Sequence, residues 1–173
     1  MKKAAKWVII AVVALAVVIC VSTSVYTVSE NEYACVVRFE KIVSTTDTPG
    51  LHFKVPFIDG IKRFPKAVML YDISPSEVLT ADKQNMTVDS YVLWEINDPL
   101  KFYQSLGSIS VAEQRLDALT YNALKNIMGT LAQRDIINED DAMERNDIYA
   151  GIASDVAELT DTYGIGIVDI KIK

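Results

Sequence analysis

Histidine, cysteine and glycine are scarce in this 173-residue chain, which contains one, two and seven of them. Cys20 lies in an apolar run and Cys35 in a predicted strand, so the cysteines do not form a disulfide framework. With a single histidine they also do not make a metal cluster of the usual type. No GxGxxG or GxxxxGK[ST] phosphate loop is present. The sequence therefore predicts no catalytic, cofactor-binding or metal-binding residues.

Few residues could support nucleophilic catalysis, because His52 is the only imidazole available as a base. No GxSxG elbow presents a serine. A Ser–Lys dyad does not need histidine, and Ser74 or Ser90 with Lys66 or Lys83 are the candidates, although no motif surrounds them. We therefore expect a protein that is not an enzyme, with a membrane-anchored hydrolase as a minor alternative.

Positive charge is also scarce over most of the chain, whose net charge is −6. Residues 38–66 hold six basic and three acidic side chains, whereas residues 67–173 hold eight basic and eighteen acidic ones. An acidic body argues against nucleic acid as a partner, because phosphate binding needs positive surface. The basic segment has two interpretations: contact with anionic lipid headgroups, or an ordinary solvated strand face.

The chain does contain one long uncharged run, of 23 residues from Trp7 to Ser29. As a helix it would extend roughly 34 Å, enough to cross a hydrocarbon core of about 30 Å. Three lysines precede the run and Glu30 and Glu32 follow it, which predicts a cytoplasmic N-terminus. We predict a cytoplasmic segment 1–6, a transmembrane anchor 7–29 and an extracytoplasmic domain 30–173. A cleaved secretory signal is the alternative, and it exports the same domain.

Strand patterns come first in the domain. The predicted strands are 32–39, 51–55, 61–73, a short one near 77–80, and 86–97. In the second of these, Leu51, Phe53 and Val55 are predicted to face the core, with His52 on the polar face. In the last, the predicted core face holds Met86, Val88, Val92, Trp94 and Ile96.

Helical patterns follow. Asp98-Pro99 predicts an N-cap and a short helix ending at Gly107, and Ser110 to Glu113 has the spacing of a capping box for the next helix. A turn or short helix over 130–137 precedes a longer helix, 138–163, that closes at Gly164. Its apolar stripe is predicted to include Ile152, Val156 and Leu159. A last strand covers 168–173, so the order predicts an α+β domain with a mostly antiparallel sheet and packed helices.

Three segments of the chain are similar to a known family. The anchor followed by EYACVVRFEKI, then TPGLHFKVPFID, then MTVDSYVLWEINDP resembles the stomatin/prohibitin/flotillin (SPFH, band-7) family, nearest to its HflC-type bacterial branch. The closing GIGIVDIKIK is similar to the family's last strand. Glu40 departs from the pattern, because the family commonly has glycine there. The chain also stops at Lys173, where family members continue into a long coiled coil, so we expect a truncated member.

The resemblance implies a non-enzymatic scaffold in the inner membrane, without a cofactor. HflC-type proteins pair with HflK-like partners in large oligomers that surround the FtsH-type ATP-dependent protease and direct its access to membrane-protein substrates. For this chain the implied partners are therefore an HflK-like protein, the protease and the lipid bilayer. An exported module that binds lipid or peptide in an apolar groove is the alternative from another functional class.

Overall fold

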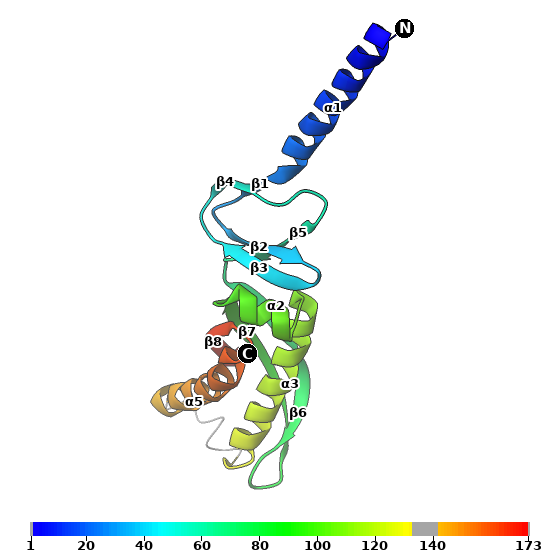
Figure 1. Cartoon of the computed structure of the whole chain (residues 1–173). Coiled ribbons are helices and arrows are strands. Elements are labelled where there is room, and N and C mark those ends of the chain that lie inside the picture. The colour runs from blue at the N-terminus through cyan, green and yellow to red at the C-terminus, as the bar shows by residue number, and fades with distance from the viewer. Residues whose placement is uncertain (1, 133–141, 173) are drawn as a thin grey trace. The chain divides into compact units, whose positions relative to one another are not determined.

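The computed structural model describes residues 2–132 and 142–172, with the side chains of residues 6, 7, 9–132 and 150–171. The chain divides into two compact units, Met1–Pro65 and Lys66–Lys173 (Figure 1). Helices and antiparallel sheets make up both of them, which confirms the predicted α+β class. The two units together cover the predicted domain 30–173, whose outer limits remain a prediction.

Unit 1 begins with a helix and continues as two small sheets. The helix is α1 (Lys2–Ser24), and the strands are β1 (Val25–Val28), β2 (Glu32–Arg38), β3 (Lys41–Thr46), β4 (Gly50–Phe53) and β5 (Asp59–Pro65). β1 pairs with β4, while β2 lies between β3 and β5 in the second sheet. β1 pairs with β4 and β2 with β5 although these strands are distant in sequence, whereas β2 and β3 form a hairpin.

The helix α1 ends at Ser24, five residues before the end predicted for the anchor. The reason is local, because Val25 to Val28 adopt the extended conformation and pair with β4. Every side chain described in α1 up to Thr23 is exposed. Among the residues that the structure describes, no helix combines the length and mean hydropathy required to cross a membrane.

The core of unit 1 is small and is formed where the two sheets face each other. It consists of Tyr26 and Val28 from β1 with Ala34 and Val36 from β2, and Ile61 of β5 packs against them. The β2–β3 hairpin turns at Phe39 and Glu40, whose φ angles are +48° and +64°. Two left-handed residues between paired Arg38 and Lys41 are the requirement of a type I′ turn. Glu40, where the sequence departs from the glycine expected from the resemblance, is thus a position at which glycine would relieve backbone strain.

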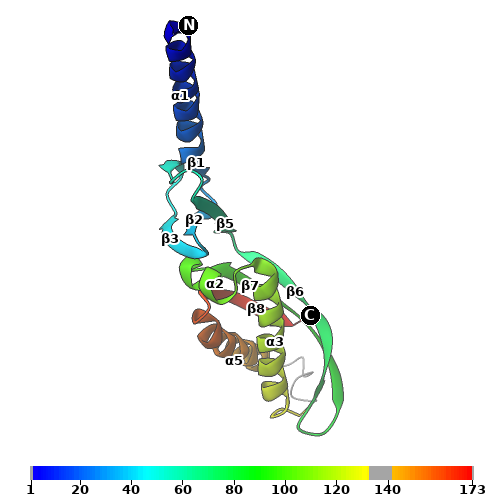
Figure 2. The same cartoon turned by 45° about the vertical axis from the view of Figure 1, so that its right-hand side comes forward.

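Unit 2 is a three-stranded antiparallel sheet with helices on one face. Its elements are β6 (Met69–Leu79), β7 (Asn85–Ile96), α2 (Pro99–Ser105), α3 (Ile109–Met128), α5 (Ala142–Asp161) and β8 (Ile165–Ile172). β7 is central, between β6 and β8. Figure 2 shows α3 along β6, and α5 contacts both α3 and β8.

The alternation predicted for β7 is confirmed, because Val88, Val92, Trp94 and Ile96 are buried. Trp94 stacks on Phe102 of α2 with ring centroids 6.3 Å apart. The helices complete this core with Leu116, Leu124, Met128, Ile152 and Val156, all fully buried. A bulge in the β7–β8 register turns Val168 outward, where half of its surface is exposed.

The predicted helix ends are right in part. Asp98 caps α2 as predicted, accepting hydrogen bonds from the N–H groups of Leu100 and Lys101. The predicted capping box is wrong by two residues, because Ser108 caps α3 through the Val111 N–H. Leu159 is exposed, and Thr160 takes the buried position. The segment 133–141, which includes most of the predicted turn 130–137 and the start of the last helix, lies outside the described residues.

The single strand predicted over 61–73 is two strands, β5 and β6, which belong to different units. β5 ends at Pro65, which has no N–H to donate to a ladder. Because both halves are extended and amphipathic, their periodicity gives no sign of the division. The short strand predicted near 77–80 is the end of β6.

Candidate functional site

The orientation predicted for β4 is wrong, because its apolar side chains lie on the exposed face of the strand and not in the core. Leu51 and Phe53 are exposed by 69% and 79%, whereas His52 between them is half-buried. Antiparallel pairing places His52 opposite Tyr26, and Tyr26 points into the core. His52 must therefore share the inward face, and its apolar neighbours are turned to the outside.

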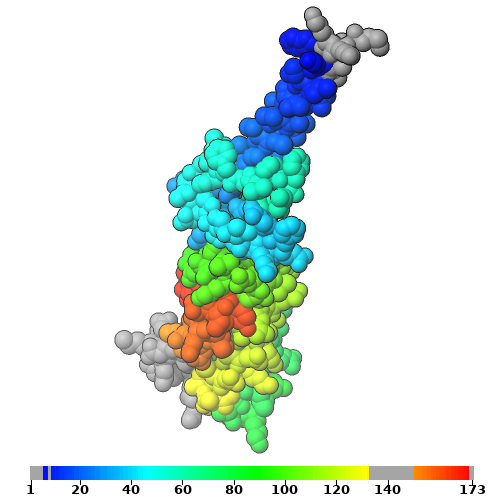
Figure 3. All heavy atoms as spheres, viewed as in Figure 1, coloured from blue at the N-terminus to red at the C-terminus, as the bar shows by residue number. Residues whose placement is uncertain are grey.

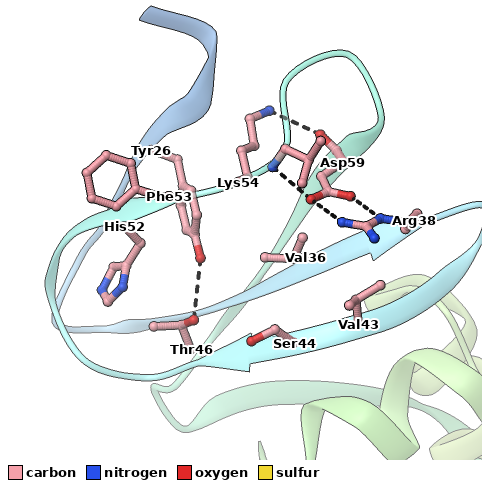
Figure 4. A pocket seen from close by; sticks show the side chains of 11 residues that line it. Tyr26, Val36, Arg38, Val43, Ser44, Thr46, His52, Phe53, Lys54 and Asp59 are labelled. Carbon is pink, nitrogen blue, oxygen red and sulfur yellow. Dashed lines mark hydrogen bonds and ion pairs between the residues drawn. The ribbon is translucent and has the colours of Figure 1, made fainter. Parts of the chain in front are cut away.

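Between the two sheets of unit 1 lies an open cavity of about 540 Å³. Figure 4 shows its walls, with β1 and β4 on one side and β2 and β3 on the other. The cavity is lined by Tyr26, Val36, Arg38, Val43, Ser44, Thr46, His52, Phe53, Lys54, Val55 and Asp59. Four strands, β1 to β4, therefore place a lysine, an arginine, a histidine and three hydroxyl groups around one space.

Asp59 anchors one wall of the cavity, and its side chain is almost fully buried. Arg38 donates from Nε to Oδ1 at 2.7 Å and from Nη2 to Oδ2 at 3.0 Å. The Val55 N–H donates to Oδ2 at 2.9 Å. The hydrogen bond from Arg38, with further help from Val55 N–H and from the charges of Arg38 and Lys54, holds the pKa of the Asp59 carboxyl below its usual range, although burial opposes the shift. Both oxygens of this carboxylate are thus already bound.

The opposite side of the cavity is held by weaker contacts. The Tyr26 and Thr46 hydroxyls are 3.4 Å apart, and the His52 ring lies 5.7 Å from the Tyr26 ring between centroids. His52 Nε2 is 2.9 Å from the Thr48 carbonyl oxygen, so Nε2 donates there. On the side of Asp59, Lys54 Nζ donates to the Asp59 carbonyl oxygen at 3.2 Å. This arrangement can bind an anion or a polar headgroup, but it presents no nucleophile aligned with a base.

The structure does not bring the candidate Ser–Lys pairs together. Ser90 is buried in the middle of β7, opposite Ile73, whereas Lys83 lies in the turn before that strand. Ser74 is on β6, and Lys66 precedes that strand. Four or five residues of extended strand, roughly 13–17 Å, separate each serine from either lysine. His52 belongs to unit 1, away from both serines along the chain.

Within the described residues no group of three histidine, cysteine or acidic side chains could hold a metal ion. The prediction of no catalytic, cofactor-binding or metal-binding residue stays a prediction. Sequence reasoning missed the cavity altogether, although it singled out His52 and the basic segment. The pairing of β1 with β4 is one of the pairings that unite the lining residues, and nothing local in the sequence marks it.

Comparison with known proteins supports the resemblance seen in the sequence. Residues 26–173 match the family described as SPFH domain / Band 7 family. The chain is 30% identical to Protein HflC of Haemophilus influenzae over 164 residues, which is 88% of this chain and 54% of that protein. It is 32% identical to the Modulator of FtsH protease HflC of Escherichia coli K12 over 139 residues, covering 76% of this chain and 41% of the relative.

A more distant relative is Protein HflC of Treponema pallidum, 27% identical over 121 residues, or 70% of this chain and 37% of that protein. The chain thus spans about half, or less, of the length of the relatives it matches. The similarity covers both units, since the family match begins in β1 and continues through β8. The predicted resemblance to this family, nearest to its HflC-type branch, is confirmed.

Proposed function

Because this chain belongs to the SPFH domain / Band 7 family, we propose that it is a non-enzymatic, membrane-anchored modulator of an FtsH-type protease. The observation that carries the proposal is the similarity to proteins named HflC, one of which is named a modulator of FtsH protease. An HflK-like protein is the expected partner in the assembly. The absence of an aligned nucleophile and base in the described cavity and among the candidate Ser–Lys pairs is consistent with a scaffold.

The proposed anchor is α1. Its residues 7–24 carry no charge, and at 1.5 Å per residue they extend about 27 Å, close to the thickness of a hydrocarbon core. Figure 3 shows the side chains of α1 uncovered by the rest of unit 1. The described apolar side chains of this helix up to Thr23 are exposed, and lipid would cover them. Lys2, Lys3 and Lys6 precede this uncharged run and favour a cytoplasmic N-terminus with both units outside the inner membrane.

Unit 1 is proposed to rest on the membrane surface. Five apolar side chains from β4 and the turn after it are exposed: Leu51, Phe53, Val55, Phe57 and Ile58. Exposed apolar groups this close in sequence indicate an interaction surface rather than ordinary solvent contact. The hydrogen bond from Lys54 N to Ser24 O ties β4 to the end of the proposed anchor. A position at the membrane surface favours the first of the two interpretations of the basic segment 38–66, contact with anionic headgroups.

Unit 2 is proposed to contribute to the assembly. Residues 66–173 hold nine basic and eighteen acidic side chains, so an anionic membrane surface would repel this unit. Side-by-side packing with copies or with an HflK-like relative closes into a ring if the rotation between neighbours allows it. The ring would then act by geometry, controlling which membrane proteins reach the enclosed protease.

A crosslinking pull-down from membranes tests this function. The chain is tagged at its C-terminus and compared with a version extended to the length of the HflC relatives. A second control replaces residues 7–24 with an unrelated membrane span, which separates contacts of the units from contacts of the anchor. We expect the extended version, with either anchor, to recover an HflK-like protein and the FtsH-type protease. Recovery of neither by any version would contradict the proposed function.

A lipid-binding module is the second candidate function, and the cavity between the sheets of unit 1 favours it. Lipid that co-purifies and exchanges without a change in oligomer size would support this alternative. The two functions are compatible, because a scaffold can bind lipid at its membrane-facing end. The hydrolase alternative has no support in the described geometry.

A further inference from the structure

We propose that the cavity between the two sheets of unit 1 binds the phosphate group of a membrane phospholipid. The inference rests on the proposed function, because it assumes that α1 is a membrane anchor. At about 540 Å³ the cavity is within the usual size range of small-ligand sites. Free phosphate offers the same anionic oxygens, but the position of the cavity favours lipid as the source.

The charge of the cavity suits an anion. Asp59 is the one carboxylate in its wall, and its oxygens are taken by Arg38 and the Val55 N–H. The charges of Arg38 and Asp59 cancel, and Lys54 remains as the uncompensated cation. With the described residues its Nζ makes one hydrogen bond, to the Asp59 carbonyl oxygen, and an ammonium group has three donors. A phosphate oxygen can accept from the remaining donors, and such charge-assisted hydrogen bonds are among the strongest in proteins.

The other walls match the rest of a lipid headgroup. The Ser44 hydroxyl makes no hydrogen bond with the described residues, and the Tyr26–Thr46 contact is long for two hydroxyls at 3.4 Å. These groups can donate to phosphate or glycerol oxygens. Phe53 and Val55 line the same cavity while much of their surface is exposed to the outside. They offer an apolar path for the first carbons of an acyl chain.

The short distance between the cavity and the end of the proposed anchor favours lipid over free phosphate as the ligand. Phe53 pairs with Val25, the first residue after α1, and Lys54 N donates to Ser24 O at 2.7 Å. Tyr26 is two residues past the helix end, about 7 Å along an extended strand. The headgroup layer adds roughly 5–7 Å to each side of the hydrocarbon core. With α1 across the membrane, β1 and β4 lie at the level of the lipid phosphates.

Native mass spectrometry of the full chain tests the inference. The protein is extracted from nanodiscs of equal phosphatidylcholine and phosphatidylglycerol, and retained lipids are identified. Lys54→Gln removes the uncompensated charge but can still donate to the Asp59 carbonyl oxygen. Lys54→Arg keeps the charge. Lys62→Gln removes an exposed lysine of β5 outside the cavity and is the matched control.

We expect the wild type, Lys54→Arg and Lys62→Gln to retain phosphatidylglycerol, and Lys54→Gln to retain at least about tenfold less, as loss of a charged hydrogen bond implies. An equal loss for Lys54→Gln and Lys62→Gln would overturn the inference in favour of general surface charge. No loss for Lys54→Gln would also overturn it, because the Lys54 charge would then not hold the lipid. Displacement of the lipid by millimolar inorganic phosphate would make free phosphate the ligand and would overturn it as well.

Alkaline carbonate extraction of the same membranes separates this inference from the proposed function. A wild-type chain that stays in the membrane but shows no retention of phosphatidylglycerol would contradict the lipid site alone. A wild-type chain released by carbonate would contradict the anchor and, with it, the lipid site. Retention in the membrane together with loss of lipid only in Lys54→Gln supports both.

Discussion

At the scale of single residues, unit 1 depends on one buried carboxylate. Asp59 joins β5 to β2 through Arg38, and it joins the turn after β4 to the same point through the Val55 N–H. Another polar contact within this unit is made by Arg63, which donates to the Thr27 carbonyl oxygen at 3.1 Å. The unit has a small apolar core, so its stability should respond strongly to the charge of Asp59.

Asp59→Asn should destabilise unit 1 in a pH-dependent manner. The pKa of the Asp59 carboxyl is lowered in the folded chain, mainly by the Arg38 hydrogen bond, from an ordinary value of about 3.9. The unfolded chain therefore binds the proton more readily, and the stabilisation is complete above about pH 4 and is lost as pH falls through the folded pKa. The difference between wild type and variant should be large at pH 7 and should shrink below pH 4.

Hydrogen exchange of the β2 and β5 amides, measured at pH values from 3 to 7 on the detergent-solubilised full chain and corrected for intrinsic exchange rates, checks this prediction. Glu32, whose pKa is lowered mainly by the Ser29 N–H, contributes to both proteins and cancels in the comparison. Asp161→Asn changes an exposed carboxylate without an ion pair among the described residues and should leave β2 and β5 unchanged. A difference that is constant across this pH range would contradict the role assigned to the charge.

At the scale of elements, the backbone at the junction between α5 and β8 lies very close to the backbone at the end of β7. Gly164 has φ +73°, and its carbonyl oxygen accepts from the Asn97 and Asp98 N–H groups at 3.0 and 3.1 Å. A Cβ at Gly164 would overlap the Asp98 carbonyl oxygen. This glycine thus joins the end of β7 and the cap of α2 to the start of β8.

Gly164→Ala should destabilise unit 2 by more than about 2 kcal/mol, because the side chain is both strained and obstructed. Gly151→Ala is the control within α5, where the nearest atom to a new Cβ is Ile127 Cδ1 at 3.9 Å. That change should stabilise the helix by about 0.5–1 kcal/mol. Thermal unfolding followed by Trp94 fluorescence, in a Trp7→Phe background, should show shifts of opposite sign. A Gly164→Ala midpoint equal to that of the wild type would contradict this account.

The same elements show how far sequence patterns reach. β7 was predictable because both its alternation and its buried face are strong, with a helix layer covering Val92 and Trp94. β4 has equally clear alternation, but alternation states only which residues share a face. Which face is covered depends on the pairing with β1, and that pairing turns Tyr26 and His52 inward instead of Leu51 and Phe53. The cavity was unpredictable for the same reason.

At the scale of the whole molecule, charge and hydropathy divide along the chain as the units do. Unit 1 carries eight basic and five acidic residues with the apolar α1, whereas unit 2 carries nine and eighteen. The sequence predicted this asymmetry but not the division at Pro65, because two consecutive strands of similar pattern meet there. Family membership was predictable from motifs that span both units, and the match over residues 26–173 confirms it.

The measurement that tests the central claim most directly is the degradation rate of a membrane-protein substrate by the FtsH-type protease. Cells lacking the chain's gene are complemented with the chain extended to the length of its HflC relatives, with an anchor-swapped version, or with nothing. The account predicts that the substrate half-life changes severalfold on complementation, while degradation of a soluble substrate of the same protease does not change. Identical half-lives of the membrane substrate in all three strains would contradict a role in modulating the protease.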